Sequence, residues 1–180
     1  MRELEDHFQL GHLTASLVLG QAGNHVDVNG TSKLLGGPAD LELLKFFRSR
    51  SSWVLTTGAT ARAERYRIPS KAKLAILSRQ GELALPETLD ASDVTLLGSD
   101  FPMSIASAIE HLENLNPGGI LLEFGPQTLL AALTELDRLQ IILSSEFETG
   151  ASNFAAANNL LLGKPQVVEQ LFITQVTGRA

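Results

Sequence analysis

Short apolar runs alternate along the chain with segments whose hydrophobic residues recur at helical spacing. Strands are predicted at residues 12–21, 25–28, 53–56, 73–77, 94–97, 120–122, 138–143 and 167–176. Helices are predicted from near residue 38 to about residue 50 and at residues 61–65, 103–115 and 127–133. Residues 80–92 read as a loop, and residues 144–163 read as irregular. Alternating strands and helices favour an α/β fold with a mostly parallel central sheet, helices on both faces and an antiparallel C-terminal edge.

The stretch at residues 118–133, GGILLEFGPQTLLAAL, predicts a buried strand, a turn and then a helix. Pro126 suits the first helical position, and Gly125 allows a ligand to approach the backbone closely. The free N–H groups of the first helical turn make a seat for an anion such as phosphate. An ordinary strand-to-helix connection is the alternative, and the motif taken alone favours it.

Two further strand ends carry residues suited to phosphate. Residues 57–62 place Gly58 between a short apolar strand and a helical segment, and two anion seats at strand ends suit a dinucleotide. Ser78 and Arg79 end another predicted strand. A hydroxyl beside a guanidinium suits one more phosphate, such as the 2′-phosphate of NADP. A solvated strand end is the alternative for this pair, and spacing alone favours it.

Length and charge narrow the classes of function. The 180 residues suit one domain over residues 1–180, with residues 1–10 as a polar lead-in. A net charge of −6 argues against general nucleic-acid binding. No apolar run approaches the ~20 residues that span a membrane, and the charged N-terminal segment is unlike a signal peptide. The cytoplasm is therefore the expected location.

Several common chemistries lack their sequence signals. The absence of cysteine excludes disulfides, thiolate metal sites and cysteine nucleophiles. The histidines show no metal-ligand spacing, so no metal site is expected; they are His7, His12, His25 and His111. No G-x-G-x-x-G follows a predicted strand, and neither a P-loop nor a G-x-S-x-G motif is present.

Two stretches carry a resemblance to a known family. Residues 26–69, VDVNGTSKLLGGPADLELLKFFRSRSSWVLTTGATARAERYRIP, resemble the reductase domain of riboflavin biosynthesis, and residues 121–144 look like its second signature, E-G-G-P-T followed by a helix and a strand. That domain reduces the ribosyl group of a diaminopyrimidine or aminouracil ribose phosphate with NADPH. The resemblance covers about residues 13–145. It implies a dihydrofolate-reductase-like fold, a homodimer, a phosphorylated small-molecule substrate and NADPH as cofactor.

The resemblance also implies roles for individual residues, although it assigns no catalytic residue. The residues implied for cofactor binding are Leu34, Gly58, Thr60, Ser78, Arg79, Gly125, Pro126, Gln127 and Thr128. Ser32, Arg48 and Glu123 match positions that hold the substrate. A guanidinium can clamp a ribose phosphate, and a carboxylate can accept hydrogen bonds from an aminopyrimidine. The alternatives are a surface arginine near a helix C-terminus and a capping carboxylate.

Two departures from the family pattern keep a second hypothesis open. Ala22 stands where the family carries an active-site Asp, and alanine can neither orient a substrate nor relay a proton. His25 and Asp27 would share a face of the strand predicted there, although a short exposed strand is the favoured reading. Phe124 replaces the first of the paired glycines and would crowd the nicotinamide. An active NADPH-dependent reductase is favoured over a catalytically silent relative that binds a nucleotide or supports a partner.

Overall fold

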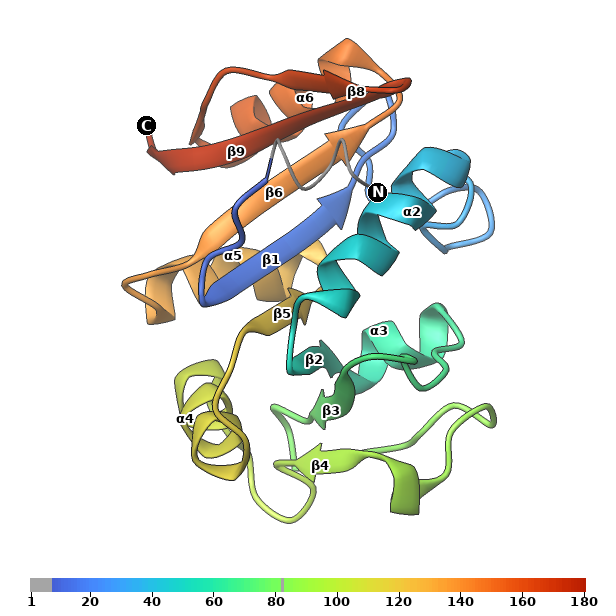
Figure 1. The fold of residues 1–180 in the computed structure, drawn as a ribbon, viewed down its shortest axis with the longest axis vertical. Coiled ribbons are helices and arrows are strands. Elements are labelled where there is room, and N and C mark those ends of the chain that lie inside the picture. The colour runs from blue at the N-terminus through green and yellow to red at the C-terminus, as the bar shows by residue number, and fades with distance from the viewer. Residues whose placement is uncertain (1–7, 82) are drawn as a thin grey trace. The chain divides into compact units, whose positions relative to one another are not determined.

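The computed structural model describes residues 8–81 and 83–180 (Figure 1). Residues 1–7 of the predicted lead-in, with His7, lie outside the described residues. The strands are β1 (Leu13–Val18), β2 (Trp53–Thr57), β3 (Lys73–Leu77), β4 (Thr95–Leu97), β5 (Ile120–Glu123), β6 (Gln140–Ser145), β7 (Leu160–Leu162), β8 (Gln166–Val168) and β9 (Leu171–Arg179). The helices are α2 (Gly37–Ser49), α3 (Gly58–Ala63), α4 (Ile105–Leu115), α5 (Pro126–Glu135) and α6 (Glu148–Asn158), with a short 3₁₀ helix at Ala91–Asp93.

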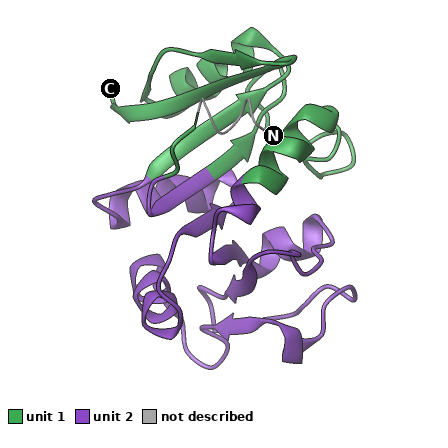
Figure 2. Cartoon of the chain, viewed as in Figure 1, with its two compact units in different colours: residues 1–10, 16–46, 140–180 green, residues 11–15, 47–139 purple. Residues whose placement is uncertain are grey.

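The chain divides into two compact units, which Figure 2 colours separately. Unit 1 comprises residues 1–10, 16–46 and 140–180, and unit 2 comprises residues 11–15 and 47–139. The expectation of a single domain stays a prediction.

Unit 2 contains a parallel sheet in the order β4-β3-β2-β5-β1, where β1 contributes its first residues. β2 and β5 are buried along their whole length, as expected for strands covered on both faces. Thr57 pairs with Leu77 of β3, and Thr56 pairs with Glu123 of β5. The carboxyl ends of these three neighbouring strands are therefore aligned. Helix α3 packs on β2 and β3, and α4 packs on α5.

Unit 1 contains the antiparallel part of the fold. β9 pairs antiparallel with β6, and also with β7 and β8. Helix α6 packs on β6 and β7. The backbone amide of Leu19, just after β1, donates to the carbonyl of Ser144 in β6 at 2.8 Å. The predicted α/β class with a mostly parallel sheet and antiparallel C-terminal strands is confirmed.

Residues 144–163 were expected to be irregular, and that expectation is wrong. They contain helix α6 and strand β7. The buried face of α6 consists of Gly150, Ala151, Phe154 and Ala155. Phe154 is the one large side chain among these four, so the usual helical period of large hydrophobic residues is absent. The helix ends at Asn159, which has φ +53° and supplies the left-handed cap.

Two predicted strands also differ from the structure. Residues 167–176 are not one strand but part of a hairpin, in which β8 and β9 reverse at Glu169, a residue with φ +56°. Residues 25–28 form a loop because Asp27 accepts hydrogen bonds from the amides of Asn29 and Thr31 at 2.7 and 3.2 Å. His25 and Asp27 therefore do not share a strand face.

Helix α2 forms where it was predicted, with Pro38 in its first turn, but its buried face differs. Helical spacing places Leu41, Leu44 and Phe47 on the apolar face, with Leu43 as a further candidate, yet Leu41 is 50% exposed. The buried residues are Leu43, Phe46 and Phe47. Their spacing of i, i+3 and i+4 is the regular stripe of an amphipathic helix, shifted from the predicted one.

We expect Gly150→Ala to destabilise the protein, although alanine is the better helix former. A Cβ at residue 150 would lie 2.3 Å from Ser145 Oγ and 2.8 Å from the carbonyl oxygen of Gly20. Overpacking of this kind costs about 1–3 kcal/mol. Urea unfolding measures the change. The control is Gly178→Ala in β9, where the nearest atom, Leu161 Cδ1, is 3.9 Å away. Equal stabilities for the two variants would contradict the close packing of α6.

Candidate functional site

Three turns with polar or glycine residues follow neighbouring strands of unit 2. Ser78 follows β3, Gly58 follows β2, and Gly125 follows β5 after Phe124. Because the strands are parallel and aligned, these turns lie along one edge of the sheet. A Cβ at Gly125 would lie 3.8 Å from Thr60 Oγ1, so the second and third turns are close neighbours. The structure thus brings together the predicted anion seats, while their roles stay predictions.

The turn after β5 places at the start of α5 a cap residue, Gly125, that has no side chain to bind the helical amides. Gly125 is the N-cap residue and Pro126 occupies the first turn, as the sequence predicted. The amides of Gln127 and Thr128 belong to this turn, where helical N–H groups lack intrahelical partners. With the positive end of the helix dipole, they suit a phosphate oxygen.

The turn after β2 is more enclosed. Thr57 caps α3 by accepting a hydrogen bond from the Thr60 amide at 3.2 Å. A Cβ at Gly58 would lie only 2.6 Å from Leu83 Cδ1. Arg62 Nη1 donates to the carbonyl of Ala84 at 2.7 Å, which holds the adjoining loop near this helix. A phosphate at Gly58 therefore requires the Leu83 side chain to turn aside. The helix begins at Gly58, earlier than the predicted residue 61.

The turn after β3 is not a simple solvated strand end. Ser78 is 5% exposed, and its hydroxyl accepts a hydrogen bond from the Gln80 amide at 3.4 Å. Arg79 is more exposed, and its Nη2 lies 3.6 Å from Glu135 Oε1. One buried hydroxyl and one accessible guanidinium therefore occupy this strand end.

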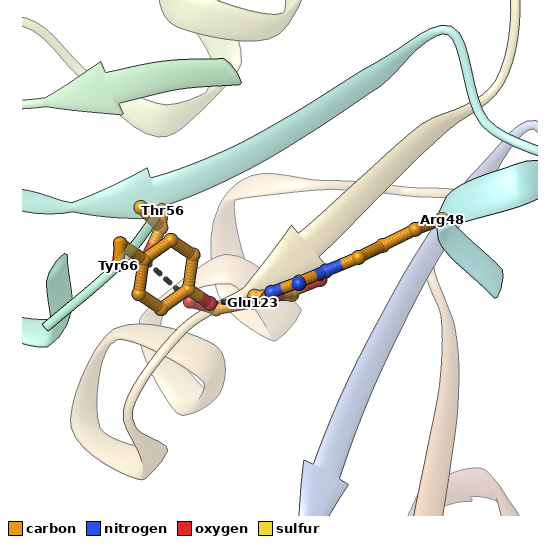
Figure 3. Close-up of polar contacts among 4 residues, drawn as sticks. All are labelled: Arg48, Thr56, Tyr66 and Glu123. Atoms are coloured by element: carbon orange, nitrogen blue, oxygen red, sulfur yellow. Dashed lines mark hydrogen bonds and ion pairs between the residues drawn. The ribbon is translucent and has the colours of Figure 1, made fainter. Parts of the chain in front are cut away.

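Arg48 and Glu123, both predicted to hold substrate, bind each other (Figure 3). Arg48 Nε donates to Glu123 Oε1 at 2.7 Å, and Nη2 donates to Oε2 at 2.6 Å. Glu123 is 7% exposed at the end of β5, and Arg48 is 24% exposed in the last turn of α2. This bidentate pair is neither a free surface arginine nor a capping carboxylate.

Tyr66 completes this cluster, and sequence reasoning missed it. Its hydroxyl donates to Glu123 Oε2, and its ring centroid lies 5.4 Å from Arg48 Cζ (Figure 3). Thr56 Oγ1 donates to the carbonyl oxygen of Glu123 at 2.7 Å. The one available signal was a lone aromatic side chain among arginines after α3, which no motif singles out.

The cluster sets its own charge state. Burial lowers the pKa of Arg48, but its hydrogen bonds to Glu123 and the charge of that carboxylate outweigh burial and raise the pKa above its ordinary value. Burial, followed by the negative charge of Glu123, raises the pKa of Tyr66 well above its ordinary value. At neutral pH the cluster therefore contains a charged guanidinium and a protonated phenol.

The sequence singled out four further residues, of which Ser32, Leu34 and Ala22 belong to unit 1 and Phe124 to unit 2. Leu34 is 67% exposed, and the Ser32 carbonyl accepts a hydrogen bond from Leu35 at 3.0 Å. The proposed contacts of Ser32 and Leu34 with substrate and cofactor stay predictions. Ala22 is exposed in a turn, whereas Phe124 is 3% exposed. Within residues 8–81 and 83–180, no three His, Asp or Glu side chains gather as metal ligands would.

No family model and no curated protein matches the sequence. The structure resembles the riboflavin biosynthesis reductase Rib7 of Saccharomyces cerevisiae, with a TM-score of 0.67, 10% identity and coverage of 99% of this chain and 98% of that one. It also resembles a dihydrofolate reductase from Enterococcus faecalis complexed with NADP(H), with a TM-score of 0.57, 15% identity and coverage of 93% and 95%. The chain has a dihydrofolate-reductase-like fold. The fold that the sequence resemblance implied is thereby confirmed.

A longer protein with this fold is named for two activities. It is the diaminohydroxyphosphoribosylaminopyrimidine deaminase/5-amino-6-(5-phosphoribosylamino)uracil reductase of Thermotoga maritima, with a TM-score of 0.64 and 14% identity. The match covers 93% of this chain but 56% of that protein.

In the part of the chain that the structure describes, no helix has the length and hydrophobicity to cross a membrane.

We expect Glu123→Ala to destabilise the protein by about 3 kcal/mol, because Arg48 would remain largely buried without its partner. The matched control is Glu113→Ala, which removes a 39% exposed carboxylate that pairs with His12 at 2.7 Å. Exposed pairs contribute about 0.2–1 kcal/mol. Urea unfolding compares both variants with the parent chain, and similar losses for the two would argue against a buried Arg48–Glu123 pair.

Tyr66 is the single tyrosine of the sequence, so near-ultraviolet absorbance follows its ionisation alone. We expect no tyrosinate signal at about pH 10, the ordinary pKa, while the fold persists. Because the folded-state pKa is raised, the unfolded chain loses this proton first, and the free energy of unfolding falls as the pH rises above about 10. Circular dichroism monitors the fold, and Tyr66→Phe is the blank. Ionisation near pH 10 in a folded sample would contradict the buried phenol.

Proposed function

We propose that the chain is an NADPH-dependent reductase that transfers hydride to a phosphorylated ribosyl-pyrimidine-type substrate, as a 5-amino-6-(5-phosphoribosylamino)uracil reductase does. The observation that carries the proposal is the alignment of three strand ends in unit 2, which gathers Ser78, Gly58 and Gly125 at one edge of the sheet. The carboxyl ends of parallel strands are where open α/β sheets bind their ligands. The fold shared with Rib7 and with a dihydrofolate reductase complexed with NADP(H) supports the same reading.

The residues present fit a nicotinamide dinucleotide once the Leu83 side chain has turned away from Gly58. The uncapped start of α5 offers the amides of Gln127 and Thr128 to a phosphate, and Gly125 leaves room for close approach. Gly58 and Thr60 would line the neighbouring turn. Pro126 begins α5 at a position where an N–H would have no intrahelical partner, so its missing N–H costs the helix no hydrogen bond. Ser78 and Arg79 would meet the 2′-phosphate, and Leu34 would lie against the cofactor. When bound, NADPH supplies the hydride that reduces a ring-opened ribose carbon.

On the substrate side, Arg48 and Glu123 would act as one preformed unit. Arg48 would present its guanidinium to the ribose phosphate, and Glu123 would accept hydrogen bonds from the pyrimidine. Their bidentate contact, together with Tyr66, restrains both side chains before any ligand arrives. Preorganised groups lose less freedom when a substrate binds. Ser32 would provide a further substrate contact, and we expect a cytoplasmic homodimer.

A catalytically silent relative is the second candidate. Ala22 is favourable to it, because an exposed methyl group stands where the resembled family has an aspartate. The mutual engagement of Arg48 and Glu123 is favourable as well, since each already satisfies the other. Such a protein would bind the nucleotide without turning over a substrate.

We expect NADPH to raise the thermal unfolding midpoint of the parent chain, because a ligand at about a hundredfold its dissociation constant adds roughly 2.7 kcal/mol. Gly125→Asp should abolish this shift, because an aspartate at the N-cap satisfies the α5 amides and repels a phosphate. The unliganded variant should remain folded, since residue 125 already has the extended conformation of an N-cap. Gly125→Ala is the control and adds only a Cβ 3.8 Å from Thr60 Oγ1.

The absence of any NADPH shift in the folded parent chain at millimolar ligand would refute the reductase proposal. A shift that survives in Gly125→Asp would place the nucleotide elsewhere. The two candidate functions separate in a second assay, NADPH oxidation with 5-amino-6-(5-phosphoribosylamino)uracil. Turnover indicates the reductase, and binding without turnover of this compound favours the silent relative.

A further inference from the structure

Glu135 occupies a position that helix electrostatics disfavour. It is the last residue of α5, where the negative end of the helix dipole repels a carboxylate. The structure shows what offsets this cost. Glu135 Oε2 accepts a hydrogen bond from the amide of Ile105, the first residue of α4, at 3.0 Å. The carboxylate is therefore held at the positive end of a second helix.

The other oxygen of this fixed carboxylate faces a residue of the proposed cofactor site. Arg79 Nη2 lies 3.6 Å from Glu135 Oε1. This separation is within ion-pair range but too long for a hydrogen bond. Arg79 thus feels the negative charge of Glu135, and this contact does not use an N–H donor of the guanidinium. The Arg79 side chain is 44% exposed and that of Glu135 is 27% exposed, so solvent screens the attraction only partly.

We propose that Glu135 is a cofactor-specificity residue that reduces the preference of this chain for NADPH over NADH. The inference rests on the proposed function, in which Arg79 meets the 2′-phosphate. A phosphate monoester carries about −1.5 to −2 charges at neutral pH. It must share Arg79 with the carboxylate and also lie near that carboxylate. NADH has a hydroxyl in place of this phosphate and is indifferent to the same charge.

A purely structural role for Glu135 predicts a different result. If the side chain only caps α4, its charge has no influence on nucleotide choice. Glu135→Gln separates the two roles, because the amide oxygen of glutamine still accepts from the Ile105 amide while the negative charge is lost. The matched control is Glu110→Gln, which removes the same charge from an exposed position on α4.

The test measures dissociation constants for NADPH and NADH at low ionic strength by nucleotide fluorescence. Glu135→Gln should lower the constant for NADPH by about three- to fivefold, in line with partly exposed charge interactions, and leave that for NADH nearly unchanged. Glu110→Gln should change neither. In an Arg79→Gln background, the gain from Glu135→Gln should shrink, because the two residues act on the same phosphate.

An unchanged NADPH-to-NADH ratio in Glu135→Gln, or a shift toward NADH, would overturn the inference while leaving the proposed function intact. Should Glu135→Gln prove unstable, Glu135→Ala removes the same charge and is measured in the same way. The inference requires its gain in NADPH affinity relative to NADH to grow as added salt is lowered, and a salt-independent ratio would overturn it. Failure of the parent chain to bind either nucleotide would overturn the proposed function and this inference together.

Discussion

The parallel register of β2 with β3 and β5 is the constraint on which the candidate site depends. Pairing of Thr57 with Leu77 and of Thr56 with Glu123 brings three chain reversals to one edge of the sheet. A strand shifted by one residue would turn every side chain to the other face. The apolar runs of these strands, buried on both faces, hold that register by packing. Core packing in unit 2 therefore decides whether the polar groups of the turns meet.

The Arg48–Glu123–Tyr66 cluster buries charged groups in unit 2. Removing two charges from water costs several kcal/mol per ion, which only close geometry and further hydrogen bonds offset. Here a bidentate ion pair and the hydroxyl of Tyr66 supply them, while Thr56 binds the backbone carbonyl of Glu123. Such a cluster contributes little net stability compared with an apolar packing of the same volume. Its clear effect is to fix the orientation of the Arg48 guanidinium at the end of β5.

The sequence predicted those parts of the fold whose signal is local and strong. β3 was predicted at its observed bounds, and Gly125 and Pro126 marked the start of α5, because buried apolar runs and proline follow directly from packing and backbone geometry. Helix α6 was not predicted because its buried face consists of Gly150, two alanines and Phe154, and a single large side chain makes no hydrophobic period. The hairpin of β8 and β9 was not predicted because Glu169 is not a usual turn residue.

The candidate site shows the same contrast between features with a local sequence signal and features without one. The glycine turns could be located from the sequence because each directly follows an apolar strand, and their binding roles stay predictions. The mutual pairing of Arg48 with Glu123, and the arrival of Tyr66 beside them, depend on side-chain directions across segments far apart in sequence. No periodicity encodes such contacts. Glu135 in α5 likewise contacts both Arg79 at the end of β3 and the Ile105 amide of α4, and only the three-dimensional structure shows these contacts.

The placement of the aromatic side chains has a consequence for optical experiments. The sequence contains one tryptophan and one tyrosine, and both Trp53 and Tyr66 belong to unit 2. Tryptophan emission during unfolding therefore reports on unit 2, while the antiparallel strands of unit 1 are silent to this probe. Backbone circular dichroism detects both units. Coincident transitions by the two probes would mean that the units melt cooperatively, and separated transitions would resolve them as independent folding units.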